Sequence, residues 1–251
     1  MGPGAASAVA SMNYLVFDIE TRVDKSLLRA IYRPNRSTTD EEAYQDVRQQ
    51  LEREHGSDFV PISFHVPICV ALGAVDEDLK LDRIDVLGAE AGNERELAAG
   101  FWARVEALAG ALLSFNGRGF DLPVLELQAL RHGIEAPRYF NERNGQRYRY
   151  SDRHYDLYDF LSNSGVHRIR GGLDLVSKLI GLPGKGDVSG RDVQALWDAG
   201  KVSEIQRYCR RDVVQTYLLF LRVERMRGRI GAEELDALWS AAAVWRAELG
   251  E

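Results

Sequence analysis

The segment NYLVFDIE, residues 13–20, combines the first expected strand of the chain with its first chemical signal. Its first seven residues form a short apolar run rich in β-forming side chains, which predicts a buried strand. Asp18 and Glu20 stand two positions apart, so on a strand they share one face, whereas their apolar neighbours take the other. Adjacent carboxylates repel each other and resist desolvation, and a divalent cation relieves both effects. Asp18 and Glu20 are therefore candidate metal ligands, and the alternative is a solvated strand end.

Strand-like and helix-like segments follow this first strand, without repeats or low-complexity blocks. Further strands are expected at residues 66–75, 81–87 and 111–115. Helices are expected at residues 40–54, 94–109, 122–131, 155–161, 173–180, 191–199, 203–227 and 232–249. Strands followed by helices that must cover a sheet predict one α/β domain with a mixed central sheet flanked by helices, and a helical C-terminal part.

The chain divides into four parts by composition. Residues 1–12 are mostly small, which predicts a disordered leader or an expression remnant, with Met12 as the natural start. The domain itself is expected over residues 13–230, interrupted by a polar insertion at about 24–65. Residues 231–251 are expected to form a C-terminal helix packed on the same domain.

The composition excludes several classes of protein. Hydrophobic residues make up 45% of the 251 positions and charged residues 28%, as in ordinary globular proteins. No apolar run approaches the ~20 residues needed to span a bilayer, which argues against a membrane protein. Cys69 and Cys209 lie far apart and form no CxxC pair. This excludes a disulfide scaffold or a zinc ribbon and suits a reducing compartment, so a cytoplasmic location is expected.

The net charge of −6 argues at first against a nucleic-acid partner. Its distribution is uneven, however: residues 1–130 carry −9, and residues 131–251 carry +3. Arginine accounts for 27 of the 32 basic residues, and its planar guanidinium suits phosphate oxygens. A GC-rich genome would produce the same arginine excess, so composition leaves both interpretations open.

A second chemical signal is NGRGFD, residues 116–121. It follows an expected strand and opens an expected helix, which places Asp121 where α/β folds bind their ligands. The glycines relieve backbone crowding in the turn. The alternative is that Asp121 only caps the next helix, a position that aspartate favours.

A third signal is YCRRD, residues 208–212, inside the long expected helix. A spacing of four places Tyr208 and Asp212 on one helix face, one turn apart and near the apolar side. A phenol beside a carboxylate could handle the proton of a water molecule. The alternative is a tyrosine packed in the core, with Asp212 paired to Arg211 or another arginine.

Taken together, the three motifs carry a family resemblance. D-x-E on the first strand, N-x3-F-D after a later strand and Y-x3-D on a late helix resemble the tyrosine-bearing branch of the DEDD superfamily of 3′–5′ exonucleases. The blocks FDIET, SFNGRGFDLPVL, HYDLYDFL, GLPGKGDVSG and YCRRDVVQTYLLFLR resemble predicted 3′–5′ exonucleases related to the proofreading domain of family B DNA polymerases. This resemblance covers about residues 13–225.

The resemblance implies a ribonuclease H-like fold and hydrolysis of phosphodiester bonds from a 3′ end, one nucleotide at a time. It implies that two divalent ions, Mg²⁺ or Mn²⁺, are held by Asp18, Glu20, Asp121 and Asp212. Tyr208 would orient the attacking water. Four acids on three elements suit such chemistry, because phosphoryl transfer needs positioning and charge neutralisation more than a covalent nucleophile.

Three further residues are candidate substrate contacts. Asn116 and Phe120 flank Asp121 and would contact the terminal nucleotide, Phe120 by stacking; core packing is the alternative for Phe120. Lys185 lies in GLPGKG, which lacks the Ser or Thr of a nucleoside-triphosphatase loop but could contact a substrate phosphate. Arginines 143, 147, 149 and 153 with interleaved tyrosines indicate a single-strand track, or else a solvated loop.

The expected partner is therefore a nucleic acid, with single-stranded DNA or unpaired 3′ ends first and RNA second. No membrane partner is expected. Two other functions stay open: a non-catalytic nucleic-acid-binding or assembly module that keeps the nuclease fold, and a hydrolase of small phosphodiesters that uses the same site.

Overall fold

The computed structural model describes residues 13–34, 37–88, 93–184, 190 and 192–250 of the chain. A five-stranded sheet in the order β3-β2-β1-β4-β5 lies at its centre. The strands are β1 (Tyr14–Val23), β2 (His65–Val75), β3 (Leu81–Leu87), β4 (Ala111–Ser114) and β5 (His154–Asp156). Because β2 runs antiparallel to β1 and β3 while β4 and β5 run parallel to β1, the sheet is mixed, as the sequence predicts.

Strand β1 is the central strand and runs past the end of its parallel neighbour. It pairs with β4 only from Tyr14 to Val16, whereas its pairing with β2 continues to Val23. The register against β2 shifts between Glu20 and Thr21, which pair with Cys69 and Pro67, so β2 carries one extra residue there. Such β-bulges bend a strand locally and are frequent beside active sites.

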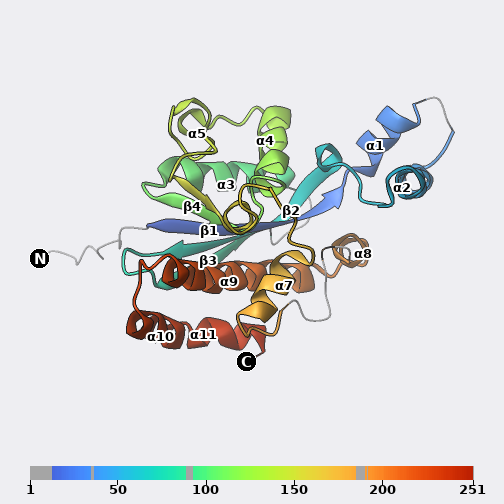
Figure 1. Cartoon of the computed structure of the whole chain (residues 1–251). Coiled ribbons are helices and arrows are strands. Elements are labelled where there is room, and N and C mark those ends of the chain that lie inside the picture. The colour runs from blue at the N-terminus through green and yellow to red at the C-terminus, as the bar shows by residue number, and fades with distance from the viewer. Residues whose placement is uncertain (1–12, 35–36, 89–92, 185–189, 191, 251) are drawn as a thin grey trace, which may run out of the picture.

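Helices cover both faces of the sheet (Figure 1). One face carries α3 (Glu94–Ala107), α4 (Asp121–His132) and α5 (Pro137–Asn141). The opposite face carries α9 (Val202–Met226), and α7 (Gly172–Leu179) lies against α9. Beyond α9 lie α10 (Ala232–Ala241), α11 (Ala243–Arg246) and the 3-10 helix η2 (Ala247–Leu249). The short helices α6 (Leu157–Leu161) and α8 (Val193–Asp198) complete the set.

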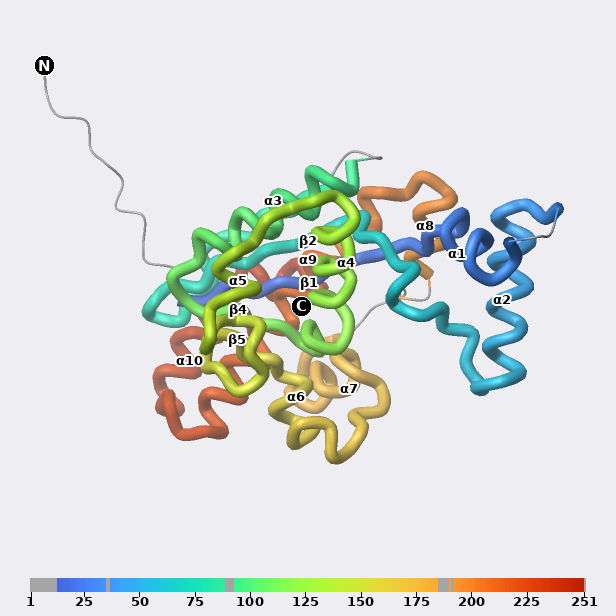
Figure 2. The backbone as a smooth tube through the Cα atoms, turned by 90° about the horizontal axis from the view of Figure 1, so that it is seen from above, coloured from blue at the N-terminus to red at the C-terminus, as the bar shows by residue number. Residues whose placement is uncertain are grey.

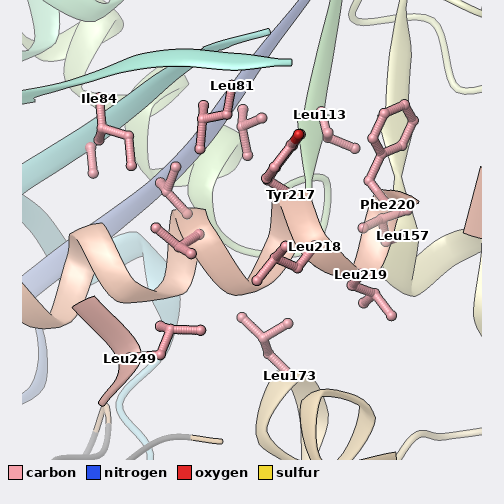
Figure 3. Packing of buried hydrophobic residues seen from close by; sticks show 14 of the residues in the cluster. Leu81, Ile84, Leu113, Leu157, Leu173, Tyr217, Leu218, Leu219, Phe220 and Leu249 are labelled. Atoms are coloured by element: carbon pink, nitrogen blue, oxygen red, sulfur yellow. The ribbon is translucent and has the colours of Figure 1, made fainter. Parts of the chain in front are cut away.

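Helix α9 is buried on two sides. Tyr217 and Phe220 of α9 belong to one apolar cluster with Leu81 of β3 on the sheet side of the helix. The same cluster continues on the other side of α9, where Leu249 lies (Figure 3). Burial of each large apolar side chain contributes about 1.5–3 kcal/mol, so this helix anchors the C-terminal third of the chain to the sheet. A fixed α9 in turn fixes the side chains at its N-terminal half.

The insertion forms a small lobe at the end of the sheet, where α1 (Lys25–Tyr32), α2 (Asp40–His55) and α8 lie together (Figure 2). Its own apolar cluster holds Leu28, Val47 and Phe64, the last from the 3-10 helix η1 (Ile62–Phe64). Helix α2 begins with a capping box between Thr39 and Glu42, which satisfies backbone donors of the first turn.

The structure also differs from the sequence prediction in several elements. Helices α1 and α5 and strand β5 were not predicted; α5 has five residues and β5 three, too few for a periodic signal. The expected helix 232–249 is divided into α10, α11 and η2, a correction to the single C-terminal helix. The division at Ala242 directs Trp245 toward the sheet, where its indole N–H donates to the carbonyl of Leu81 at 2.9 Å. Among the described residues, no helix has the length and apolar character required to cross a membrane.

Candidate active site

The two carboxylates of β1 lie on the α9 face of the sheet. Their neighbours Phe17 and Ile19 pack on the opposite face with α3 and α4, as strand alternation requires. Glu20 has only 7% of its surface exposed, and Asp18 is half-buried. The solvated strand end considered from the sequence therefore does not describe Glu20.

Asp121 connects the start of α4 to β1. Strand β4 ends at Ser114, so it does not supply a backbone partner for the N–H of Ile19, and the Oδ1 of Asp121 accepts that hydrogen bond at 3.1 Å. Asp121 is the first residue of α4, and Phe120 occupies the cap position, so the alternative of Asp121 as the cap is wrong. Asp121 is 5% exposed, and its carboxylate binds the backbone N–H of Ile19, the residue that follows Asp18.

The pKa of Asp121 is raised to about 7. Burial is the largest cause, and the negative charges of Asp156 and Asp212 raise it further, while backbone hydrogen bonds oppose the rise. The interaction with Asp212 shows that the carboxylates of α4 and α9 are electrostatic neighbours. Negative charge is therefore concentrated where α4, α9 and β1 meet.

Asp156 stabilises, through hydrogen bonds, the turn that precedes Asp121. Its side chain accepts the N–H of Asn116 at 2.8 Å and the N–H of Arg118 at 2.9 Å, and it also caps the N-terminus of α6. Asn116 takes a left-handed backbone conformation with φ 67°. A buried carboxylate with this many N–H donors fixes the path of the turn. Asp156 is a supporting residue that the motifs did not identify.

The two glycines of NGRGFD are required by close packing. A Cβ at Gly117 would lie 2.5 Å from the Oγ of Ser114, and one at Gly119 would lie 2.5 Å from the Oδ1 of Asn116. At Gly117 the Cβ of Ser114 is also only 2.7 Å away, so the turn itself would have to move, whereas at Gly119 the side chain of Asn116 would have to move. The compact turn thus brings Asn116 and Asp121 to the same end of β4.

Helix α9 brings Tyr208 and Asp212 to the site from the other layer. Both side chains are buried and one turn apart. Between them, the Sγ of Cys209 donates to the carbonyl oxygen of Asp18 at 3.4 Å and lies 3.6 Å from its Oδ2. The YCRRD segment of α9 thus contacts β1 directly.

Cys209 was absent from the sequence-based site, although it stands between Tyr208 and Asp212. Burial raises the pKa of its thiol well above the usual range, and the neighbouring Cys69 raises it further, so the thiol stays protonated and acts as a donor. Cys69 stands opposite Glu20 in the β1–β2 register. Proximity to Glu20 and Asp18 cannot be read from cysteine spacing alone.

The donor set suits a divalent cation. Ligand atoms of Asp18, Glu20 and Cys209 all lie within 4.8 Å of one another. Asp121 approaches from α4, and Asp212 follows Cys209 by three positions on α9. Carboxylate oxygens are the ligands that Mg²⁺ and Mn²⁺ prefer, and a cation would offset the mutual repulsion that raises the pKa of Asp121.

The remaining predicted residues have different surroundings. Asn116 lines a pocket of about 490 Å³ together with Arg118 and Arg147. Phe120 packs edge-on against His65 at 5.5 Å between ring centres. Lys185 lies outside the described residues.

The arginine-rich stretch is largely engaged with the protein itself. Arg147 binds Glu126 through two nitrogen atoms at 3.1 Å each, and Arg149 contacts Asp159 at 3.3 Å. Arg153 donates to the main-chain carbonyl of Ala109. Arg147, Arg149 and Arg153 thus have partners within the protein, and a single-strand track along this stretch stays a prediction.

Comparison with known proteins adds a family and a fold. The model of a family described as predicted 3′–5′ exonuclease related to the exonuclease domain of PolB matches residues 57–248. The match extends to the C-terminal helices, beyond the expected limit near residue 225, and begins after Asp18 and Glu20. No curated protein matches the chain.

The solved structures that are similar to the chain include a DNA polymerase and an exonuclease. The family B DNA polymerase of the hyperthermophilic archaeon Pyrobaculum calidifontis matches over 85% of this chain with 18% identity and a TM-score of 0.54. A product-bound exonuclease I matches over 90% of this chain with 16% identity and a TM-score of 0.39. The chain spans 24% of the polymerase and 46% of exonuclease I. The polymerase match confirms the predicted ribonuclease H-like fold.

Proposed function

We propose that this chain, which belongs to the family of predicted 3′–5′ exonucleases related to the exonuclease domain of PolB, removes nucleotides from single-stranded DNA or unpaired 3′ ends in a metal-dependent reaction. We further assign it to the tyrosine-type DEDD exonucleases. The observation that carries the proposal is the meeting of acids from three elements. The N–H of Ile19 in β1 donates to Asp121 of α4, and the thiol of Cys209 in α9 donates to the carbonyl oxygen of Asp18 in β1.

Each side chain has a distinct role in this proposal. Two divalent ions would be held by the carboxylates Asp18, Glu20, Asp121 and Asp212. When bound, such ions activate a water molecule and stabilise the leaving 3′ oxygen. The phenol of Tyr208, fixed by the packing of α9, would orient the attacking water through its hydroxyl.

Substrate contacts extend from both sides of Asp121. Asn116 lies in the compact turn and lines a pocket, and Phe120 offers an aromatic ring at the start of α4. Lys185 completes the proposed set as a phosphate contact. The DNA preference rests on the family relation, and RNA is the second substrate to be tested.

The test is incubation of 5′-labelled single-stranded DNA and RNA with Mg²⁺ or Mn²⁺. We expect a ladder that shortens from the 3′ end and disappears with EDTA or in Asp18→Asn. A matched control, Asp82→Asn, changes an exposed aspartate of β3 and should keep full activity. Failure to shorten any substrate with either metal would refute the proposal. Binding without turnover would instead support a non-catalytic module, and cleavage of dinucleotides alone would support a small-phosphodiester hydrolase.

A further inference from the structure

An apolar groove lies on the exposed side of α4 and α5 and contains none of the proposed metal ligands. It has a volume of about 800 Å³, and its apolar walls include Leu127 and Leu130 of α4, Ile134 and Phe140 of α5. Leu130 exposes 80% of its surface and Phe140 exposes 40%. Apolar side chains that form a continuous patch, rather than scattered single residues, mark a site of protein contact. The proposed exonuclease activity gives this α4 groove no role.

The charges of the α4 groove disfavour a nucleic acid. The charged residues that line it are Glu126 and Glu135, and no basic residue lines it in the described part of the chain. Glu126 is neutralised by Arg147, which binds it through two nitrogen atoms at 3.1 Å each. Glu135 is exposed and has no ion pair among the residues that the structure describes. The groove therefore fits an apolar protein segment with a basic residue at one end.

The walls of the groove favour a helix as its occupant. They are helices, whose N–H and C=O groups are bonded within each helix, so they offer no strand edge to an extended segment. A segment that finds no backbone partner there has to make its own backbone hydrogen bonds, as an α-helix does. Helix α4 has 12 residues and is about 18 Å long, so a helix of two turns fits along it.

Helix α1 of the same chain has a matching exposed face. Leu27 and Ile31 stand four positions apart on one side of the helix and expose 40% and 62% of their surface. We call these two residues the α1 ridge. Leu28 faces the other way and is buried in the apolar cluster of the lobe. Arg33 follows at the end of the helix, where its side chain binds only neutral groups among the described residues.

The ridge and the groove are neighbours on one surface. Arg131, near the end of α4, pairs with Asp24 at 2.7 Å, and the side chain of Asp24 caps the first turn of α1. Both helices lie on the same side of the sheet (Figure 1). Because Leu28 fixes α1 in the lobe, the ridge cannot turn into the groove of its own chain. A two-fold axis between ridge and groove would bring each ridge to the groove of a second copy.

We propose that the protein forms a symmetric dimer in which the α1 ridge of each copy lies in the α4 groove of its partner. Ile31 then contacts the partner's Leu130 and the partner's Phe140, and Arg33 pairs with the partner's Glu135. The two-fold axis makes the same contact twice, as in an isologous interface. One interface thereby covers both exposed apolar faces and pairs both charges that have no ionic partner within the described chain.

Sedimentation equilibrium over a range of concentrations tests the dimer. The full chain should reach the mass of two copies, and Leu130→Glu should raise the dissociation constant by roughly 10-fold to 100-fold, because it places a charge against the apolar ridge. Leu179→Glu is the matched control, since Leu179 is 74% exposed on α7, outside the ridge and the groove. A monomer at every concentration overturns the inference and leaves the groove to a helix of another protein.

An exchange of charges tests how the two copies are oriented. Arg33→Glu alone and Glu135→Arg alone should each raise the dissociation constant of the dimer by roughly tenfold or more, because like charges then meet across the interface. The double variant, in which the two charges are exchanged, should restore the native dissociation constant. A loss in the double variant equal to the sum of both single losses contradicts the proposed pairing.

A disulfide across the interface locates the contact. Ile31→Cys and Leu130→Cys are prepared separately, mixed and treated with oxidised glutathione; Cys69 and Cys209 are buried and serve as internal controls. A cross-linked dimer should form in the mixture and in neither variant alone, because the ridge meets the groove rather than itself. A cross-link within a single variant, or none in the mixture, overturns the inference. None of these measurements depends on nuclease activity, so they also hold if the exonuclease proposal fails.

Discussion

Replacement of Asp121 by asparagine should stabilise the metal-free protein at neutral and alkaline pH. The ionised carboxylate of Asp121 is buried near Asp156 and Asp212, and its pKa is raised to about 7, chiefly by that burial. Asparagine has the same shape and keeps a carbonyl oxygen that can accept the N–H of Ile19. The substitution therefore removes the buried charge and retains the hydrogen bond.

The expected gain in the free energy of unfolding follows from the rise in the pKa of Asp121. A pKa of about 7 in place of 3.8 is a rise of about 3 pH units, and 1.36 kcal/mol for each unit gives about 4 kcal/mol. Asp121 is almost completely buried, so solvent screens little of this energy.

The pH dependence has a definite sign. The folded-state pKa is above the unfolded value, so the folded chain binds the proton more tightly than the unfolded chain. The stability from this group is complete below pH 3.8 and is lost as the pH rises through about 7. The native chain and Asp121→Asn should therefore be equally stable in acid and differ by about 4 kcal/mol at pH 8.5.

Urea unfolding in EDTA at several pH values measures this difference, with Asp82→Asn as the exposed control. Addition of Mg²⁺ should stabilise the native chain by about 2.7 kcal/mol at one hundred times the dissociation constant. It should stabilise Asp121→Asn much less. Equal stability of the native chain and the variant at pH 8.5 in EDTA would show that the ionised carboxylate of Asp121 does not destabilise the folded chain, and this would refute the reasoning.

Two further substitutions test the rest of the site. Tyr208→Phe should lower kcat by at least about tenfold and leave Mn²⁺ binding, measured by calorimetry, unchanged, because the substitution removes the hydroxyl proposed to orient the water and leaves all four carboxylates in place; an unchanged kcat would remove the phenol from the mechanism. Asp156→Ala should lower the free energy of unfolding by about 2–4 kcal/mol, since the N–H groups of Asn116 and Arg118 lose their acceptor. A loss under 1 kcal/mol in urea unfolding would contradict the role of Asp156 in the turn.

Local signals predicted much of the fold. The apolar run before Asp18 identified β1, and the cap at Thr39 identified the start of α2. The same alternation placed Asp18 and Glu20 on one face, which the structure confirms through the opposite packing of Phe17. These features depend on residues that are close in the sequence.

Contacts between residues far apart in the sequence could not be predicted from such local patterns. Cys209 reaches Asp18 across 191 positions, and Asp156 shapes a turn about 40 positions away. Phe59, in a stretch that reads only as polar insertion, gains its place from stacking on His65. The metal ligands, the role of Tyr208 and the domain limits stay predictions, because they concern bound groups or boundaries that geometry alone does not test.

The extra residue of β2 opposite Glu20 and Thr21 marks the boundary between the part of β1 that carries the carboxylates and the insertion that follows it. Before the irregularity, Asp18 is held in register with Ala71, and Glu20 with Cys69. After it, the strand leads into the insertion, which lines a pocket of about 540 Å³ together with Glu20 and α8. A change in the length of the lobe would fall beyond this irregularity, so the pairing that sets the spacing of Asp18 and Glu20 would stay the same.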